Sequence, residues 1–183
     1  MKRRIHTALV LLLLLVQCSP AFGLTAGVDE YLLKAVFFER FTRFIDFGYN
    51  TAVRDSFFVI TVFGENPFGD RLEQVYRDQR ILNRKVKVTY TGQVDQVGTP
   101  DMLYIGKDKK EELGALFQSL HGYPTITIAD SPSLSGSGVM INLLVIGDKI
   151  RFEIDLEAAG EKNIKFDRVL LVNAMIVKHE KTK

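Results

Sequence analysis

The sequence has almost no cysteine. Its 183 residues contain one, Cys18, which lies within the first 23 residues. Those residues have the features of a removable export leader, so we expect the mature chain to hold neither a thiol nor a disulfide. This excludes thiol catalysis, cysteine-ligated metals and thiol-based redox switching. An exported protein without disulfides depends on its hydrophobic core, and about 160 residues are enough to build one.

Catalytic motifs are also lacking. The chain contains no G-x-S-x-G, H-E-x-x-H or P-loop pattern. Beyond residue 23 the only histidines are His121 and His179, and they are not spaced as a pair of metal ligands. The serine- and glycine-rich segment 133–138 precedes a predicted strand and does not open a helix, which favours a turn over a phosphate cradle. The sequence therefore predicts a protein that is not an enzyme and holds no metal or cofactor.

Only one long apolar run occurs, over residues 8–16. Three basic residues precede it, and a polar break with small residues at positions 21 and 23 follows. This pattern is typical of a secretory signal peptide, and the run is too short to span a bilayer. Cys18 makes a lipoprotein the alternative, but a lipobox has a small residue before its cysteine, and Gln17 stands there. We expect residues 1–23 to be cleaved and residues 24–183 to form one domain in the periplasm.

Without the leader, the chain has no large excess of either charge. The formal net charge of +2 includes Lys2, Arg3 and Arg4, and no acidic residue precedes Asp29. Subtracting these three from the 24 basic residues leaves 21 against 22 acidic ones, a net charge of −1. A nearly neutral domain has no electrostatic preference for phosphate backbones, so we expect no nucleic-acid partner.

Helical and strand patterns alternate along the chain. Asn66 and Asp167 are expected to act as helix N-caps, and Gly147-Asp148 predicts a two-residue hairpin turn. Helices interleaved with buried strands indicate an α/β fold: a single-domain, three-layer, Rossmann-like sandwich with a mostly parallel sheet and an antiparallel C-terminal hairpin. The expected helices cover residues 28–47, 67–77, 109–120 and 167–178, and the expected strands cover 57–63, 85–90, 102–105, 125–129, 139–146 and 149–156.

Lys34 is a candidate site residue because it lies on the apolar side of the first predicted helix, near Leu33, Phe37 and Phe41. An ammonium group buried there costs several kcal/mol unless it is paired. Lys34 is either a structural residue, as a salt bridge or a snorkelling stem, or a charge held at a ligand or partner site. The sequence leaves both interpretations open.

Charged residues also alternate along the last predicted strand. Arg151, Glu153 and Asp155 lie on one face, and apolar residues lie on the other. One interpretation is an edge strand whose charged face is solvated and discourages aggregation. The other is a polar groove in which the guanidinium of Arg151 receives an anionic ligand.

Polar residues follow two of the predicted parallel strands. Glu65 and Asn66 come after the strand 57–63, and Asp130 and Ser131 come after the strand 125–129. Open α/β sheets usually bind ligands at the carboxyl ends of their strands. This placement predicts, as an alternative function, a periplasmic receptor that binds a small ligand, an anion included, at that edge.

Several segments together resemble the YfiR-like family of periplasmic proteins. The resemblance extends in order over nearly the whole mature chain. The matching segments are LKAVF (33–37), FTRFI (41–45), VFGENPFG (62–69), ITIAD (126–130), GVMIN (138–142), RFEIDLEAA (151–159) and RVLL (168–171).

The resemblance implies a Rossmann-like domain without catalysis. The best understood role in the family is to bind the periplasmic sensor region of a membrane-bound diguanylate cyclase and hold the cyclase inactive, so that loss of the restraint raises cyclic di-GMP and favours biofilm growth. Some members carry disulfides tied to a redox response, which this mature chain lacks. The resemblance implies site or scaffold roles for Lys34, Asp130, Arg151 and Glu153.

The leading hypothesis is a periplasmic regulatory binding protein. It would restrain a membrane-bound signalling protein, a diguanylate cyclase or a sensor kinase, through contact with that protein's periplasmic region. The identity of the partner and the oligomeric state, a homodimer included, stay open. The residues expected to bind a partner or ligand are Lys34, Glu65, Asn66, Asp130, Arg151 and Glu153.

Overall fold

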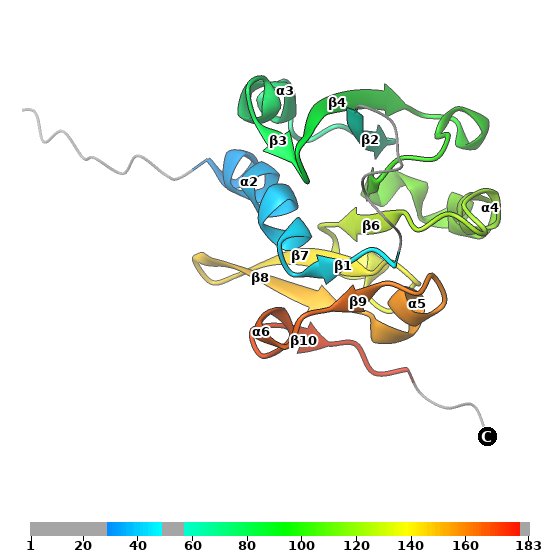
Figure 1. The fold of residues 1–183 in the computed structure, drawn as a ribbon. Helices are drawn as coiled ribbons and strands as arrows, with labels where there is room; N and C mark the ends of the chain where they lie inside the picture. The colour runs from blue at the N-terminus through cyan, green and yellow to red at the C-terminus, as the bar shows by residue number, and fades with distance from the viewer. Residues whose placement is uncertain (1–28, 49–56, 180–183) are drawn as a thin grey trace, which may run out of the picture.

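The computed structural model describes residues 29–48 and 57–179 (Figure 1). The predicted signal peptide, residues 1–23, lies outside the described residues. Within the described ranges, none of the helices combines the length and the apolarity needed to cross a bilayer.

An eight-stranded sheet forms the centre of the fold, in the order β10-β8-β7-β6-β5-β2-β4-β3. Five neighbouring strands, β4, β2, β5, β6 and β7, are mutually parallel. β7 turns back into the antiparallel β8 through Gly147, whose φ of 65° suits glycine. The predicted α/β fold, with its mostly parallel sheet and C-terminal hairpin, is confirmed. The strands are β2 (Phe57–Phe63), β3 (Arg80–Ile81), β4 (Arg84–Thr91), β5 (Met102–Ile105), β6 (Ile126–Ala129), β7 (Ile141–Ile146), β8 (Lys149–Ile154) and β10 (Met175–Ile176).

Two hydrophobic clusters, one on each face of the sheet, give the sandwich its three layers. Side chains alternate along β5, so that Met102 and Tyr104 join one cluster while Leu103 and Ile105 join the other. The first cluster packs against α2 (Glu30–Thr42), α3 (Arg71–Tyr76), α5 (Leu156–Gly160), α6 (Arg168–Leu171) and the small sheet of β1 (Ile45–Asp46) and β9 (Lys165–Phe166). The second packs against α4 (Leu113–Ser119) and the 3-10 turns η3 (Val94–Gln96) and η5 (Pro132–Leu134), with η4 (Lys107–Glu112) leading into α4.

Two helices are shorter than predicted because strands far away in the sequence take over their ends. The helix expected over 28–47 ends at Thr42, and Ile45 and Asp46 pair with β9. The helix expected over 167–178 is capped by Asp167 as predicted but ends at Leu171, after which Met175 and Ile176 pair with β8. Its β-branched end therefore forms strand, in keeping with the low helix propensity of such residues.

Two further helices start late. The helix predicted from residue 67 begins at Arg71, because Asn66 closes a local turn, in which its side-chain oxygen accepts from the Phe68 amide at 3.0 Å. The helix predicted over 109–120 opens with the 3-10 turn η4 and becomes α-helical at Leu113.

Candidate functional site

A buried ion pair occupies the carboxyl edge of the parallel strands. Lys34, on α2, is 2% exposed, and its Nζ lies 2.7 Å from Oδ2 of Asp130, the residue after β6. The carboxylate of Glu30, one turn earlier on α2, lies 2.5 Å from the same Nζ. The apolar side of α2 therefore tolerates an ammonium because two carboxylates meet it there.

Two tyrosines complete this cluster. The Tyr104 hydroxyl donates to Oδ1 of Asp130 at 2.6 Å, and the ammonium of Lys34 lies 4.6 Å from the centre of the Tyr31 ring. Burial, followed by the charge of Asp130, raises the pKa of Tyr31 to about 12 and raises the pKa of Tyr104 further. Both phenols stay protonated at neutral pH, so Tyr104 is a permanent donor to Asp130. The Lys34–Asp130 pair is thus satisfied from within the protein.

The loops that follow β2 and β5 close over this cluster. In the parallel part of the sheet, β4 lies on one side of β2, while β5, β6 and β7 follow one another on the other side. Ligands of open α/β sheets usually bind beside such a switch in strand order. Here the space lined by Glu65, Tyr104, Lys107 and Asp130 has a volume of about 20 Å³, so it accommodates about one water molecule. Glu65 thus joins Asp130 at this edge, as predicted from the sequence.

Asn66 serves the turn beside that space. Its side-chain amide donates to the carbonyl of Gly69 at 2.9 Å while its oxygen accepts from the Phe68 amide. Asn66 does not line the small cavity, so the structure separates it from the other carboxyl-edge candidates.

Arg151 and Glu153 lie on the other face of the sheet. Phe152, between them, packs edge-on against Phe41 of α2 at 5.3 Å between ring centres, so alternation directs its two neighbours away from the Phe41 ring and from Lys34. Glu153 accepts from the Asn142 side-chain amide at 3.1 Å, and Asn142 also bonds the backbone of Ser131. The loop after β6 therefore connects the two groups of candidate residues.

Asp155, placed by the sequence on the solvated charged face, is instead 1% exposed. Its Oδ1 caps α5 by accepting from the amides of Glu157 and Ala158, and its Oδ2 lies 2.9 Å from Nε2 of His179. The edge interpretation of β8 holds only in part, because β10 pairs with the end of β8 at Glu153 and Ile154.

The β7–β8 hairpin projects past the carboxyl edge of its neighbour. The last residue pair between β6 and β7 is Ala129 with Asn142, so among the described strands only β8 pairs with residues 143–146 (Figure 1). At the tip, Val145 is 47% exposed and Ile146 is 52% exposed. Between this hairpin and α2 lies an open groove of about 470 Å³. The hairpin groove is lined by Leu33, Phe37, Asp148, Lys149, Ile150 and Arg151.

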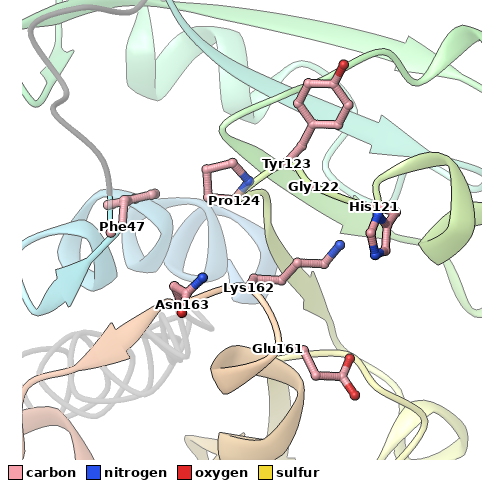
Figure 2. A pocket seen from close by; sticks show the side chains of 9 residues that line it. Phe47, His121, Gly122, Tyr123, Pro124, Glu161, Lys162 and Asn163 are labelled. Atoms are coloured by element: carbon pink, nitrogen blue, oxygen red, sulfur yellow. The ribbon is translucent and has the colours of Figure 1, made fainter.

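A larger pocket lies at the amino edge of β6, and no motif in the sequence pointed to it. It measures about 590 Å³ and is formed mainly by the loop 121–124 before β6 and the loop 161–163 after α5 (Figure 2). Lys162 reaches across it, and its Nζ donates to the carbonyl of Leu120 at 2.8 Å. The two charged residues of the loop Glu161-Lys162-Asn163 are the sequence feature that could have indicated a binding site, but nothing in the sequence placed this loop beside His121.

No cluster of three or more histidine, cysteine, aspartate or glutamate side chains suited to a metal ion occurs among residues 29–48 and 57–179.

A solved structure shares this fold at low sequence identity. A crystal structure of a conserved domain protein from Vibrio cholerae O1 biovar El Tor has a TM-score of 0.55 at 12% identity, which covers 81% of this chain. This similarity concerns the fold alone, and the present chain spans 60% of that protein. The ABC domain from Streptococcus pneumoniae in complex with L-Trp reaches a TM-score of 0.47 at 8% identity, covering 66% of this chain and 55% of that one, and this similarity is too low to indicate a shared fold. No curated protein matches the chain.

The family model for YfiR/HmsC-like proteins, DUF4154, matches residues 31–174. The match includes α2 from Tyr31 onward, the strands of the central sheet from β2 to β8, and α6. Proteins of this family are periplasmic and regulate cyclic di-GMP signalling, a regulatory role and not a catalytic one. With most of its length matched by this model, the chain belongs to the YfiR/HmsC-like family.

Proposed function

We propose that this protein is a periplasmic regulator that restrains a membrane-bound signalling protein by direct contact. The partner is a diguanylate cyclase or a sensor kinase of the inner membrane, engaged through its periplasmic region. The family assignment supports the regulatory role, and one structural observation, the exposed aliphatic tip of the β7–β8 hairpin beside the hairpin groove, supports a protein partner.

The hairpin groove has the composition of a protein-binding surface. Its floor contains the partly buried Leu33, Phe37 and Ile150, and its rim carries the exposed cations Lys149 and Arg151. An apolar centre with a polar rim is typical of protein interfaces, and arginine is enriched in them. A matching partner segment is amphipathic, with aliphatic side chains for the floor and carboxylates for the rim.

The buried ion pair holds one wall of this groove in place. Lys34 follows Leu33 directly on α2, and its bond to Asp130 anchors that part of the helix to the end of β6. Because the hairpin is an extension of β7, the next strand in the sheet, the ion pair contributes to the spacing between helix and hairpin. In this proposal Lys34 and Asp130 are scaffold residues, and Arg151 is a contact residue.

Restraint requires a difference in affinity for two states of the sensor. A regulator that binds only the inactive state shifts the sensor toward it, and moving an equilibrium from 1:99 to 99:1 takes about 5.5 kcal/mol of differential binding. A few well-packed contacts, each contributing about 2 kcal/mol, are sufficient.

The proposal is tested by placing a charge on the hairpin tip. Ile146→Asp should weaken capture of the cyclase or kinase from detergent-solubilised inner membranes and raise signalling output, because a carboxylate enters an apolar contact. Ile146 is already 52% exposed, so folding should be unaffected. Val172→Asp is the matched control, since Val172 is an aliphatic side chain that is 75% exposed and lies just after α6.

The two variants separate the possible failures. Loss of capture with Ile146→Asp alone supports the hairpin as the contact. Loss with Val172→Asp alone moves the contact to the α6–β10 surface and refutes the role of the hairpin. If crosslinking in intact cells captures no inner-membrane signalling protein with the unaltered chain, the proposed restraint itself is refuted.

A further inference from the structure

The amino-edge pocket contains a lysine without a counter-ion. Lys162 has no carboxylate within ion-pair distance among the residues that the structure describes, and its Nζ donates one hydrogen bond, to the carbonyl of Leu120. Burial lowers the pKa of Lys162, while the nearby charge of Glu161 acts in the opposite direction. Lys34, by contrast, is buried against two carboxylates. Lys162 is therefore a partly desolvated cation with donor capacity left for an anion.

Lys162 lies where two cavities meet. The outer pocket of about 590 Å³ and an inner cavity of about 130 Å³ share three lining residues, His121, Glu161 and Lys162. Figure 2 shows the Lys162 side chain extending toward His121, with the Glu161 carboxylate directed elsewhere. A ligand in the outer pocket thus meets the ammonium before it reaches the inner cavity.

The inner cavity is apolar in character. Its walls include Phe117, Leu120, Met140 and Ala158. Its two threonines are engaged in internal hydrogen bonds: Thr125 donates to the Pro100 carbonyl at 2.7 Å, and Thr127 accepts from the Met140 amide at 3.0 Å.

The size of the inner cavity limits what can enter it. An apolar cavity of about 150 Å³ in another protein binds benzene, and the present cavity of about 130 Å³ is close to that size. A single ring or a branched aliphatic group of similar bulk therefore fits.

We propose that this pocket binds a small amphipathic monocarboxylate. Its carboxylate bonds to the ammonium of Lys162, and its ring or branched chain fills the cavity beneath. The outer pocket, within the usual range of about 300–1,000 Å³ for small-molecule sites, holds the rest of the molecule. The site is separate from the hairpin groove and goes beyond the restraint proposed above, because it requires no protein partner.

The test uses 3-phenylpropionate as the probe and the protein purified from the periplasmic fraction. Calorimetry should give a Kd on the order of 0.1–1 mM, as expected for a ligand of this size. Amide signals of the loops 121–124 and 161–163 should shift in an NMR titration. The neutral probe 3-phenylpropionamide has the same ring without the charge and should bind about tenfold more weakly.

Lys162→Met removes the charge and keeps the apolar stem, and it should weaken 3-phenylpropionate about tenfold. Lys165→Met, at an exposed lysine on β9, is the control and should leave the Kd unchanged. Ala158→Leu fills the inner cavity and should also weaken the probe, with thermal unfolding used to verify the fold.

Each contrary result overturns the proposal. The proposal is wrong if 10 mM probe, on the order of ten times the upper expected Kd, produces neither heat nor an NMR shift. It is also wrong if the acid and the amide bind equally, or if Lys162→Met leaves the Kd unchanged. If Ala158→Leu does not fold, the lysine variant and the amide decide the matter. Because none of these measurements includes the membrane partner, a failure here leaves the restraint proposal standing.

Discussion

The Lys34–Asp130 pair offers a direct test of how this fold holds α2 on the sheet. Their side chains are 3% and 8% exposed, so solvent screens them little. Removing one partner of a buried ion pair leaves an uncompensated charge, which typically costs about 3–5 kcal/mol. We expect Lys34→Met to lower the free energy of unfolding by that amount, because Asp130 loses its cation and the Tyr104 hydroxyl that still donates to it is neutral.

Asp130→Asn should cost less. Glu30 remains beside Lys34, and the Tyr104 hydroxyl can still donate to the amide oxygen of the new side chain. The double variant should lose less than the two single variants combined, with a coupling energy of about 1–3 kcal/mol. A well-packed neutral pair replaces two mutually dependent charges, which is why the effects do not add.

The free energies of unfolding of the unaltered protein, the two single variants and the double variant are measured by urea unfolding at pH 7. Far-UV circular dichroism follows the transition, because the chain has no tryptophan for fluorescence. The control is Arg43→Met, which breaks an ion pair to Glu39 of the same 2.7 Å length but with a mostly exposed guanidinium. That variant should show no measurable change, as is usual for surface pairs. Strict additivity of Lys34→Met and Asp130→Asn, or equal losses in the buried and the exposed pair, would refute the reasoning.

Two further predictions concern the C-terminal segment and a loop glycine. The hydrogen bond to Asp155, then the charge of Asp155, raises the pKa of His179 above 6.5. The stabilisation is therefore fully present below pH 6.5 and is lost as the pH rises through the raised pKa, so urea unfolding of His179→Gln should differ from the unaltered protein at pH 5.5 and converge with it at pH 8.5. A constant difference would contradict this. Gly64→Ala should cost about 1–3 kcal/mol in the same assay, because Gly64 has a φ of 91° and a Cβ there would lie 2.6 Å from the Asp108 carboxylate. Gly92→Ala, with open space around it, is the control, and an equal loss in both would argue against strain.

Much of the fold was readable from local patterns. The run 57–63 matches β2 residue for residue, and Gly147-Asp148 marks the hairpin turn. These predictions succeed because burial on both faces and turn geometry each depend on a few consecutive residues. The residues that build the carboxyl edge, Glu65 and Asp130, were also predicted, because the position of a loop after a parallel strand follows from the strand itself.

The sequence by itself determined the α/β class, the family and the position of Lys34 on an apolar helix face, because hydrophobic period and motif order are properties of short segments. Only the tertiary structure decided that the partner is Asp130, 96 positions away, and that α2 and α6 give way to strands paired with β9 and β8. It also decided that Arg151 faces away from Lys34 and that Lys162 borders a pocket with His121. Each of these outcomes depends on which distant segments become neighbours in the fold, and short sequence patterns do not specify long-range contacts.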